Sequence, residues 1–461
     1  MPPPSFVISD LKTYTGMMPI NNTGYGYLVD KTLVRYDIPQ YQDKEGLSNM
    51  SDLKDKITVG IDVGCYNHRV AIADSAGHII EEFNIDHDHL GFAHLLYKLY
   101  CYEKDYDSSV VVAMEGVNGY ARPLDKMIIS KGYKLLNVNN LKLSRFREMS
   151  SSPAKTDALD AREIIKLVLY SGNFKWGKDV IQEVETVPEE HNILKRLTRR
   201  RRQLVEDKVR IMNRMESDLQ AVCPEILKLV KNKDSDCFLN LLTCRQSLEE
   251  IARIRRTTLL KIRGVGKKFA DKVQEWQKEA HFSDEIGIVA PMIVLDASMI
   301  QELKQHIKEL NLQIAEIVNS SRLGQLISSI PGFGLICTGE IVGEIGSMNR
   351  FDDEASLAYY LGMAPLDNSS GKKQGTKIPR NINTRAKAAM MTSVAHNIRE
   401  VAESKIFYNR KRSEGKRHNK AVRCLGRHMV RVIWAMVKND ELYHVKQIES
   451  VKKEGKMNLV A

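Results

Sequence analysis

The stretch ITVGIDVG (57–64) is the first strand-like segment of the sequence, and we expect ordered structure to begin there and to continue as a series of strands. The next segment, RVAIADSAGHIIEEFNI (69–85), has the composition of two strands around a glycine turn. Three strands joined by short turns predict an antiparallel meander.

Helical and strand-like segments alternate after this meander. HLGFAHLLYKLYCYE predicts a helix, SVVVAM (109–114) predicts a strand, and another helix is expected near 120–131. The strand YKLLNV (133–138) leads to helices expected at 141–149 and 156–170. Strands separated by helices usually pair in parallel, so we predict an α/β fold with one mixed sheet.

The bulk composition favours a polyanionic partner. The 461 residues suggest two or three domains, and 69 basic against 58 acidic residues give a net charge of +11. Nucleic acid is the simplest partner for such a charge. The seven cysteines are odd in number and contain no CxxC pair, which argues against a disulfide framework or zinc ribbon and favours the cytoplasm.

Residues 1–55 are expected to form an N-terminal extension that is partly disordered. They are rich in Pro, Gly, Asn and Tyr and show weak periodicity. The start, MPPPSFVISDLKTYTGMMP, lacks the features of a signal peptide, and no apolar run approaches the length expected of a segment that crosses a bilayer. We therefore expect no membrane partner.

From Leu194 onward the sequence predicts one long helix that pairs with another helix as a coiled coil. On its outer surface, Arg199, Arg200, Arg201 and Arg202 repel one another unless a counter-charge is present. A solvated helix face is one interpretation, and contact with nucleic acid is the one we favour. The apolar seam, broken twice by basic residues, consists of Leu194, Leu197, Arg201, Leu204, Lys208, Ile211, Met215, Leu219 and Val222.

Two segments, LLKIRGVGKKFADKV (259–273) and LISSIPGFGLICTGEIV (326–342), resemble each other. Each has an apolar residue, a spacer, Gly-x-Gly and a helical pattern, as in helix–hairpin–helix elements. Glycine amides at a helix N-terminus can hold a backbone phosphate, although Gly-x-Gly is often only a tight turn. The second segment is the better match, so Gly332 and Gly334 are candidate nucleic-acid-binding residues.

The C-terminal part is predicted to be helical around a polar loop, LGMAPLDNSSGKKQGTKIPRN (361–381). A final basic region (408–438) carries an apolar stripe that is more typical of a core than of a binding surface. The basic residues outside this stripe are candidates for phosphate contacts: Arg410, Lys411, Arg412, Lys416 and Arg417.

Four carboxylates can converge in this layout. Asp62 ends the first strand and Glu115 follows SVVVAM, while Asp157 and Asp160 begin the helix in KTDALDAR (155–162) and share one helix face. Neighbouring strand ends meet at one edge of a sheet, and a helix start can point there. A divalent cation would offset the repulsion between the acids, and Mg²⁺ prefers oxygen ligands while leaving positions for phosphate oxygens.

Each acid alone also has a structural explanation. Asp62 could cap a turn, Glu115 could be an edge residue, and Asp157 with Asp160 could cap a helix and occupy its first turn. The joint pattern in chain order is more specific. It matches the ribonuclease-H-like fold of RuvC-type nucleases.

Three motifs, IDVGCYNHRVAIAD, MEGVNGY and KTDALDAR, together resemble the DEDD transposases of bacterial insertion sequences. This is the IS110 family, also called bridge recombinases and related to pilin-gene invertases. The family's second block usually reads Glu-Ala-Thr-Gly-x-Tyr, which Glu115 and Tyr120 match and residues 116–118 do not. The resemblance covers about residues 57–440 and implies a RuvC-like domain whose four acids bind Mg²⁺.

The resemblance also implies a second site, since SIPGFGLICTGEIVGEIGSMNRFDDEASLAYYLGMAPLDNSSG (329–371) is similar to the family's C-terminal domain. It places a nucleophilic serine at Ser370, with Ser369 as the alternative, where the residues alone indicate a polar surface loop. The family usually has a glycine before an asparagine downstream, and here Ile382 precedes Asn383. Serine needs activation, and no histidine is near, but three lysines could stabilise phosphate charge: Lys372, Lys373 and Lys377.

The implied mechanism uses a composite active site. The acids hold Mg²⁺ near the scissile phosphate, and the serine attacks it to form a covalent 5′-phosphoserine link. Family members also imply a dimer or tetramer and a structured noncoding guide RNA that selects donor and target DNA. Base pairing would then read sequence, while the protein reads RNA shape and phosphates.

The predicted organisation has five parts: an extension (1–55), a RuvC-like catalytic domain (56–182), a helical and coiled-coil region (183–320), a helical transposase domain with the serine (321–445) and a tail (446–461). One alternative is a metal-dependent junction nuclease that uses water, with Ser370 passive. A site-specific DNA invertase is another. A non-catalytic nucleic-acid binder is disfavoured because all four acids and the serine are present.

Overall fold

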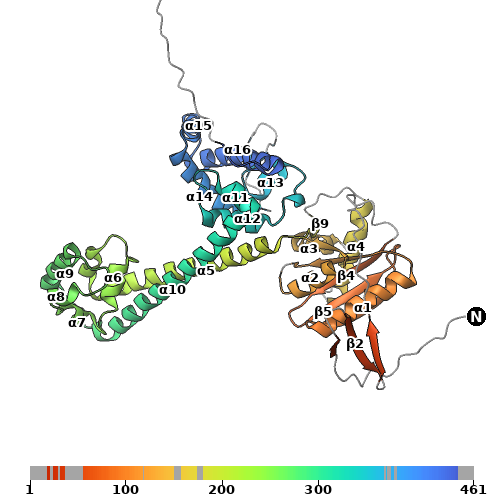
Figure 1. The fold of residues 1–461 in the computed structure, drawn as a ribbon, viewed down its shortest axis with the longest axis horizontal. Coiled ribbons are helices and arrows are strands. Elements are labelled where there is room, and N and C mark those ends of the chain that lie inside the picture. Colours follow the sequence, from red (N-terminus) through yellow and green to blue (C-terminus); the bar gives the residue numbers. More distant parts are fainter. Residues whose placement is uncertain are drawn as a thin grey trace, which may run out of the picture. The chain divides into compact units, whose positions relative to one another are not determined.

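The computed structural model describes residues 18–20, 24–29, 32–36, 56–117, 119–149, 157–173, 180–367, 370, 375–377 and 382–444. Two compact units make up the chain, residues 1–186 and 187–461 (Figure 1). Several sequence predictions lie outside the described residues: most of the extension, the tail at 446–461, and Asn118, Ser369, Lys372 and Lys373. Within the extension the backbone forms a small antiparallel sheet of β1 (Met18–Ile20), β2 (Gly24–Val29) and β3 (Thr32–Tyr36).

The first unit contains a mixed sheet in the order β6-β5-β4-β7-β8-β9. β4 pairs antiparallel with β5, and β5 with β6, while β4–β7 and β7–β8 are parallel. The predicted meander and its parallel neighbours are confirmed; the edge strand β9 is an additional feature. The bounds are β4 (Ile57–Val63), β5 (Asn67–Ala73), β6 (Ile79–Asp86), β7 (Val110–Glu115), β8 (Lys134–Val138) and β9 (Ile181–Glu183).

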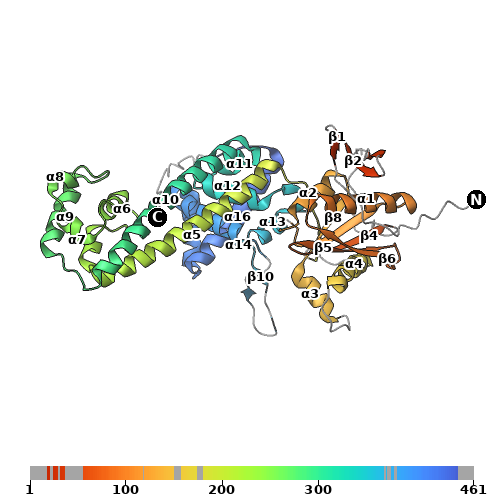
Figure 2. The same cartoon turned by 90° about the horizontal axis from the view of Figure 1, so that it is seen from below.

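Helices cover both faces of this sheet. α1 (His89–Asp105) and α2 (Arg122–Ser130) lie on one side, and α3 (Asn140–Met149) and α4 (Asp157–Asn173) lie on the other (Figure 2). Successive side chains of a strand point to opposite faces, so each strand contributes to two cores. Val112 packs in the core that includes α1 and α2, whereas its neighbours Val111 and Ala113 pack with Ile164 of α4.

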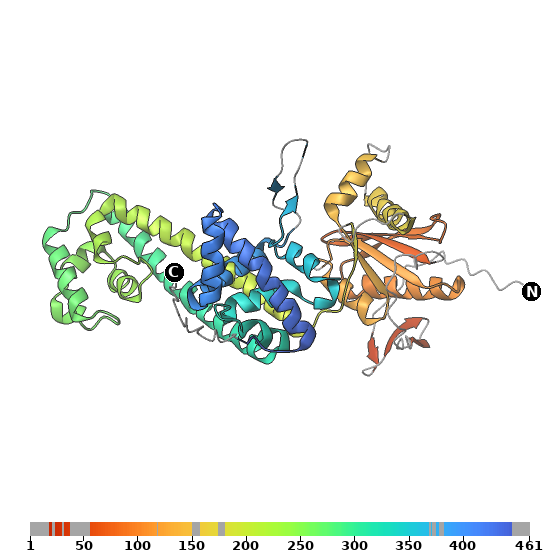
Figure 3. The ribbon, with the colours of Figure 1, turned by 90° about the horizontal axis from the view of Figure 1, so that it is seen from above.

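The second unit is built on two long helices, α5 (Glu189–Val222) and α10 (Ile286–Ser320), which pack along each other (Figures 1 and 3). One end carries a hydrophobic core formed with η3 (Pro224–Leu229), α6 (Asp236–Leu242), α7 (Leu248–Ala252), α8 (Arg256–Leu259) and α9 (Lys267–Glu279). The other end carries a second core with α11 (Arg322–Ser328), α12 (Leu335–Ile345), η4 (Met348–Arg350), α13 (Glu354–Tyr360), α14 (Thr384–Glu400), α15 (Ala402–Ser413) and α16 (His418–Asn439).

The predicted long helix is α5, and the partner for its seam is α10 of the same chain. Leu194, Leu204 and Met215 of the seam are buried as expected. The two basic residues that interrupt it have partners: Arg201 donates from Nε to Oδ1 of Asn311 at 2.5 Å, and Lys208 forms an ion pair with Asp234. The breaks in the seam are therefore polar cross-links between helices.

α10 corrects the expectation that no apolar run has the length to cross a bilayer. Its 35 residues pass that test by length and composition alone. Within the unit, however, Ile293 and Ile300 are buried in one core and Ile314 in the other. The apolar composition of α10 is thus accounted for in part by the two hydrophobic cores that the helix joins.

Candidate active site

The register of the sheet places Asp62 and Glu115 side by side. Ile61 of β4 pairs with Met114 of parallel β7, so Asp62 and Glu115 are the next residues on adjacent strands. Both are half-buried at the carboxyl ends of their strands. Because side chains alternate along a strand, Asp62 shares the sheet face of Gly60. The structure therefore brings these two predicted acids together on the face that α4 covers.

α4 carries the other two acids and approaches β4 closely. A Cβ atom at Gly60 would lie 2.3 Å from the carbonyl oxygen of Ala161 and 2.9 Å from Cγ1 of Ile165. Further along α4, Leu169 lies beside Gly77, in the turn at the opposite end of the strands. The helix thus runs away from the end of β4 that carries Asp62, and its first turn is directed toward that end.

Asp160 is buried, with 6% of its surface exposed. Its Oδ1 lies 3.2 Å from Nε of Arg147 in α3, an ion pair that holds the carboxylate. Asp157 is the first residue of α4, as the sequence predicts, and its side chain lies outside the described residues. The ion pair with Arg147 was not anticipated, because nothing in sequence relates the two helices before they pack.

Arg162, at the end of the KTDALDAR motif, fastens α4 to the sheet. It donates from Nε and Nη2 to the two carboxylate oxygens of Glu82 in β6, at 2.5 and 2.6 Å. Arg69 of β5, which pairs in register with Asp62, also approaches Glu82 at 3.4 Å. Hydrogen bonding from Arg162 lowers the pKa of Glu82 from its ordinary value. Glu82 therefore stays charged and links β6, β5 and α4 beside the acids.

The donor set suits a hard divalent cation better than a soft one. Asp62, Glu115 and Asp160 offer only carboxylate oxygens, which Mg²⁺ prefers over the nitrogen and sulfur ligands of zinc sites. Among the side chains that the structure describes, no three His, Cys, Asp or Glu residues are grouped closely enough to hold a metal. Asp62 and Glu115 offer the oxygen ligands that suit such an ion. Asp62 already interacts within the chain and Asp160 pairs with Arg147, so both would have to exchange partners to bind it.

Ser370 lies in the second unit, in a short hairpin. β10 (Leu366–Asp367) pairs antiparallel with β11 (Thr376–Lys377), and Ser370 is exposed between them. Lys377 is also exposed. The acids and the serine therefore belong to different units, and the hairpin presents the serine hydroxyl to solvent.

A buried polar network joins α5 and α12 to the start of α14. Glu344 of α12, whose side chain is 0% exposed, accepts two hydrogen bonds from Arg199 of α5, at 2.6 and 2.8 Å. It also accepts one from Nδ2 of Asn383 at 2.7 Å. Asn383 caps α14, accepting from the amides of Arg385 and Ala386. Ile382 is half-buried directly before this capping residue.

We expect Glu344→Ala to lower the free energy of unfolding of the second unit by about 2 kcal/mol, because Arg199 and Asn383 lose a shared acceptor. The estimate is at the low end for a buried pair because Arg199 reaches solvent. Thermal melting of Glu344→Ala beside exposed Glu441→Ala measures it. Equal melting temperatures would contradict the role of the network.

The same pair predicts an acid sensitivity. Burial raises the pKa of Glu344, but hydrogen bonds from Arg199 and Asn383 outweigh it and place the pKa below the ordinary value. A lowered folded-state pKa gives stability that is present above the unfolded value, near pH 4.3, and is lost as pH falls through the folded one. Glu344→Gln should therefore lose less stability than the wild type on acidification below pH 4.

Comparison with known proteins identifies the family. A family model described as a transposase, the IS110 DEDD type, matches residues 59–224, and the model "Transposase IS116/IS110/IS902 family" matches residues 324–409. The chain belongs to the IS110 family of transposases. Both matched segments contain predicted site residues: the four acids fall in the first and Ser370 in the second.

Relatives of this transposase match most of the chain. The insertion element IS116 uncharacterized 44.8 kDa protein of Streptomyces clavuligerus is 26% identical over 86% of this chain and 98% of its own length. The IS900 uncharacterized 42 kDa protein of Mycobacterium paratuberculosis is 28% identical over 71% of this chain and 82% of its own length. A mini-circle putative transposase for IS117 of Streptomyces coelicolor is 23% identical over 81% of this chain and 92% of its own length. The transposase is therefore an enzyme that acts on DNA.

In this transposase three of the four consecutive arginines meet partners within the chain. Arg199 pairs with Glu344 and Arg202 with Glu340, while Arg201 bonds Asn311. The inference that the run needs an external counter-charge is thus wrong for Arg199 and Arg202. Arg200 is exposed and is the member of the run that best fits a nucleic-acid contact.

The two glycine hairpins join helices as the sequence predicts. Gly332 has φ +85°, a conformation that favours glycine, and a Cβ there would lie 2.3 Å from the backbone nitrogen of Asn397. Gly334 caps α12, and a Cβ added there would meet nothing within 4 Å. Gly332 therefore has a packing role, whereas Gly334 leaves room at the helix N-terminus for an anion.

The candidate basic residues near the C-terminus differ in accessibility. Lys411 and Lys416 both pair with Glu414, and Arg412 donates to the carbonyl of Lys416. Hydrogen bonds from the two lysines lower the pKa of Glu414 to about 2, so it stays charged. Arg410 lies over the ring of Phe407 at 5.1 Å, and Arg417 is exposed. Arg410 and Arg417 remain the stronger phosphate candidates.

Proposed function

We propose that this transposase cuts and rejoins DNA with a RuvC-like acidic site and a serine nucleophile. Asp62, Glu115, Asp157 and Asp160 would hold Mg²⁺, and Ser370 would form the covalent 5′-phosphoserine intermediate. The observation that carries the proposal is the placement of Asp62 and Glu115 on adjacent parallel strands, on the face where α4 begins with Asp157. The sheet order, an antiparallel meander followed by parallel strands, supports the ribonuclease-H-like comparison.

The residues of the chain divide the chemistry between them. The acids would hold the ion, which when bound would supply positive charge for the oxygens of the scissile phosphate. The hydroxyl oxygen of Ser370 attacks phosphorus and the bond from phosphorus to the 3′ oxygen breaks. The proton lost by the serine hydroxyl balances the one gained by the 3′ oxygen, which leaves as a hydroxyl. A 3′ hydroxyl of the exchanging strand then attacks the phosphoserine and releases the serine. Each step breaks one phosphoester bond and forms another, so no energy source is consumed.

The partners in this proposal follow from the family. DNA is the substrate, a structured noncoding guide RNA selects donor and target, and a homodimer or tetramer completes the composite site in the cytoplasm. The net charge of +11 supports a polyanionic partner. Arg200, Gly334, Lys377, Arg410 and Arg417 are exposed or open positions from which phosphates could be bound.

Ser370→Ala is expected to abolish a covalent protein–DNA adduct while nucleic-acid binding is kept. The test co-expresses the protein with its flanking noncoding DNA, adds donor and target duplexes with Mg²⁺, and resolves the products on denaturing gels. Ser369→Ala is the matched control, since it removes the neighbouring hydroxyl of the same loop. A protease-sensitive band lost only in Ser370→Ala supports the proposal.

Other outcomes would separate the alternatives. Cleavage without an adduct in either variant would indicate a hydrolytic junction nuclease and remove Ser370 from the mechanism. Loss of the band in Ser369→Ala alone would move the nucleophile by one residue. Binding without Mg²⁺-dependent cleavage in any form would indicate a nucleic-acid-binding protein without catalysis.

A further inference from the structure

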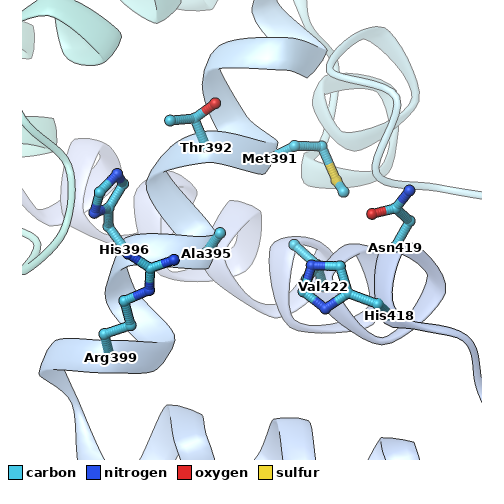
Figure 4. Close-up of a pocket in the computed structure, with 8 residues that line it drawn as sticks. All are labelled: Met391, Thr392, Ala395, His396, Arg399, His418, Asn419 and Val422. Atoms are coloured by element: carbon cyan, nitrogen blue, oxygen red, sulfur yellow. The ribbon is translucent and has the colours of Figure 1, made fainter. Parts of the chain in front are cut away.

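A pocket of about 260 Å³ opens between α14 and α16 (Figure 4). Its floor is apolar and consists of Met391, Ala395 and Val422. We propose that this pocket binds a backbone phosphate of nucleic acid, an inference that rests on the proposed DNA and RNA partners. The polar residues around the floor are Thr392, His396, Arg399, His418 and Asn419.

The charge of the pocket is one-sided. No Asp or Glu lines it, and two histidines and one arginine do. Within the described part of the chain, Arg399 and His396 make no hydrogen bond or ion pair, although other arginines of the unit do: Arg322 pairs with Asp440 and Arg427 with Glu354. Arg399 therefore keeps its donors for a ligand.

The start of α16 adds further donors on the opposite wall. The helix begins at His418, its N-cap residue Arg417 gives no side-chain cap, and its first turn contains no acid. The amides of a helix N-terminus and the helix dipole favour an anion at such a position. Nδ1 of His418 lies 2.8 Å from the hydroxyl of Tyr408, which fixes the ring and leaves Nε2 for a ligand. Two elements therefore present donors to one pocket.

These features select a phosphate over other ligands. A metal cation would be repelled by Arg399 and would find no carboxylate among the lining residues. A purely apolar ligand would contact only the apolar residues and would make no use of the donors of His396, Arg399 and Asn419. A nucleic-acid chain supplies an anion for the rim, and its sugar can contact the apolar floor. An acidic protein could supply the anion as well, but it would not explain why a transposase carries the pocket.

The experiment measures how affinity depends on salt. Wild type, Arg399→Gln and Lys438→Gln are titrated with a random-sequence 30-base-pair DNA duplex and with a 60-nucleotide stem–loop RNA. Lys438 is exposed in the last turn of α16, at the end of that helix opposite to the pocket. Its substitution therefore removes one positive charge, as Arg399→Gln does, but at a position outside the pocket. Arg399 is exposed, so neither variant should alter the melting temperature.

Arg399→Gln should reduce the slope of log affinity against log salt by about 0.9 for duplex DNA, or by about 0.7 for a single-stranded segment. It should also weaken binding about 10-fold. Lys438→Gln should change the slope and the affinity by less. An effect with DNA alone assigns the phosphate to DNA, and an effect with RNA alone assigns it to the RNA. If the wild type binds tightly and the two variants have equal slopes of log affinity against log salt, the proposal that the pocket binds a phosphate is overturned. The proposed function is then unaffected. Failure of the wild type to bind either probe would overturn both. Polyglutamate is titrated as a third probe. If Arg399→Gln weakens binding to polyglutamate but to neither nucleic acid, the ligand of the pocket is an acidic protein and the proposal is overturned.

Discussion

Asp62→Asn should lower the rate of DNA strand cleavage by about 10³-fold while DNA affinity stays within about 2-fold. Asp62 and Glu115 are neighbours on parallel strands, and both offer oxygen ligands at the same sheet edge. Charge stabilisation of a phosphoryl transition state by a bound metal is worth several kcal/mol, and about 4 kcal/mol corresponds to about 10³ in rate. Glu115→Gln should produce the same loss.

The control is Asp105→Asn, since Asp105 is an exposed acid at the end of α1 on the other face of the sheet. It should cleave at the wild-type rate. A second readout does not depend on catalysis: Mg²⁺ should raise the melting temperature of the wild type and of Asp105→Asn, because an ion that binds only the folded state stabilises it, and the rise should shrink in Asp62→Asn. Cleavage at near wild-type rate by both Asp62→Asn and Glu115→Gln would remove the acids from the mechanism.

Much of the first unit could be predicted because its sequence pattern is local. Alternating strands and helices specify a mixed sheet, and strand ends then place Asp62 and Glu115 next to each other. The sequence gives the position of each acid along the chain, but it does not predict which basic side chain forms an ion pair with it. Arg147 and Asp160 come from separate helices, so their ion pair depends on how those helices pack.

The second unit shows the same limit over longer separations. The series of apolar residues from Leu194 predicts a long helix, but its partner α10 begins more than sixty residues after that helix ends. Arg199 looks like an exposed charge in sequence, yet Glu344 neutralises it from α12. The pocket between α14 and α16 likewise unites His396 and His418, which no local motif connects. Such features need the tertiary fold.

Gly60→Ala is expected to separate the position of α4 from the chemistry of its acids. The added methyl would lie 2.3 Å from the carbonyl oxygen of Ala161, so the helix must move away from β4. Overpacking of this kind costs about 1–3 kcal/mol. A displacement of about 1 Å can cost about 10²-fold in rate when it moves catalytic groups. We therefore expect a moderate loss of stability and a loss of cleavage of about 10²-fold, measured well below the melting temperature.

Gly287→Ala is the matched control, because a Cβ there meets nothing within 4 Å and Gly287 is the second residue of α10. Alanine is the better helix former by about 1 kcal/mol, so this variant should be as stable as the wild type or more stable, with unchanged cleavage. If Gly60→Ala melts lower yet cleaves at the wild-type rate, the first turn of α4 does not belong to the active site. If it loses cleavage while Asp62→Asn does not, α4 acts through its packing and the acids of the strands are not ligands. If Gly60→Ala and Asp62→Asn both lose cleavage while Gly287→Ala keeps it, the prediction is supported. The close contact of α4 with β4 then holds Asp157 and Asp160 near Asp62 and Glu115.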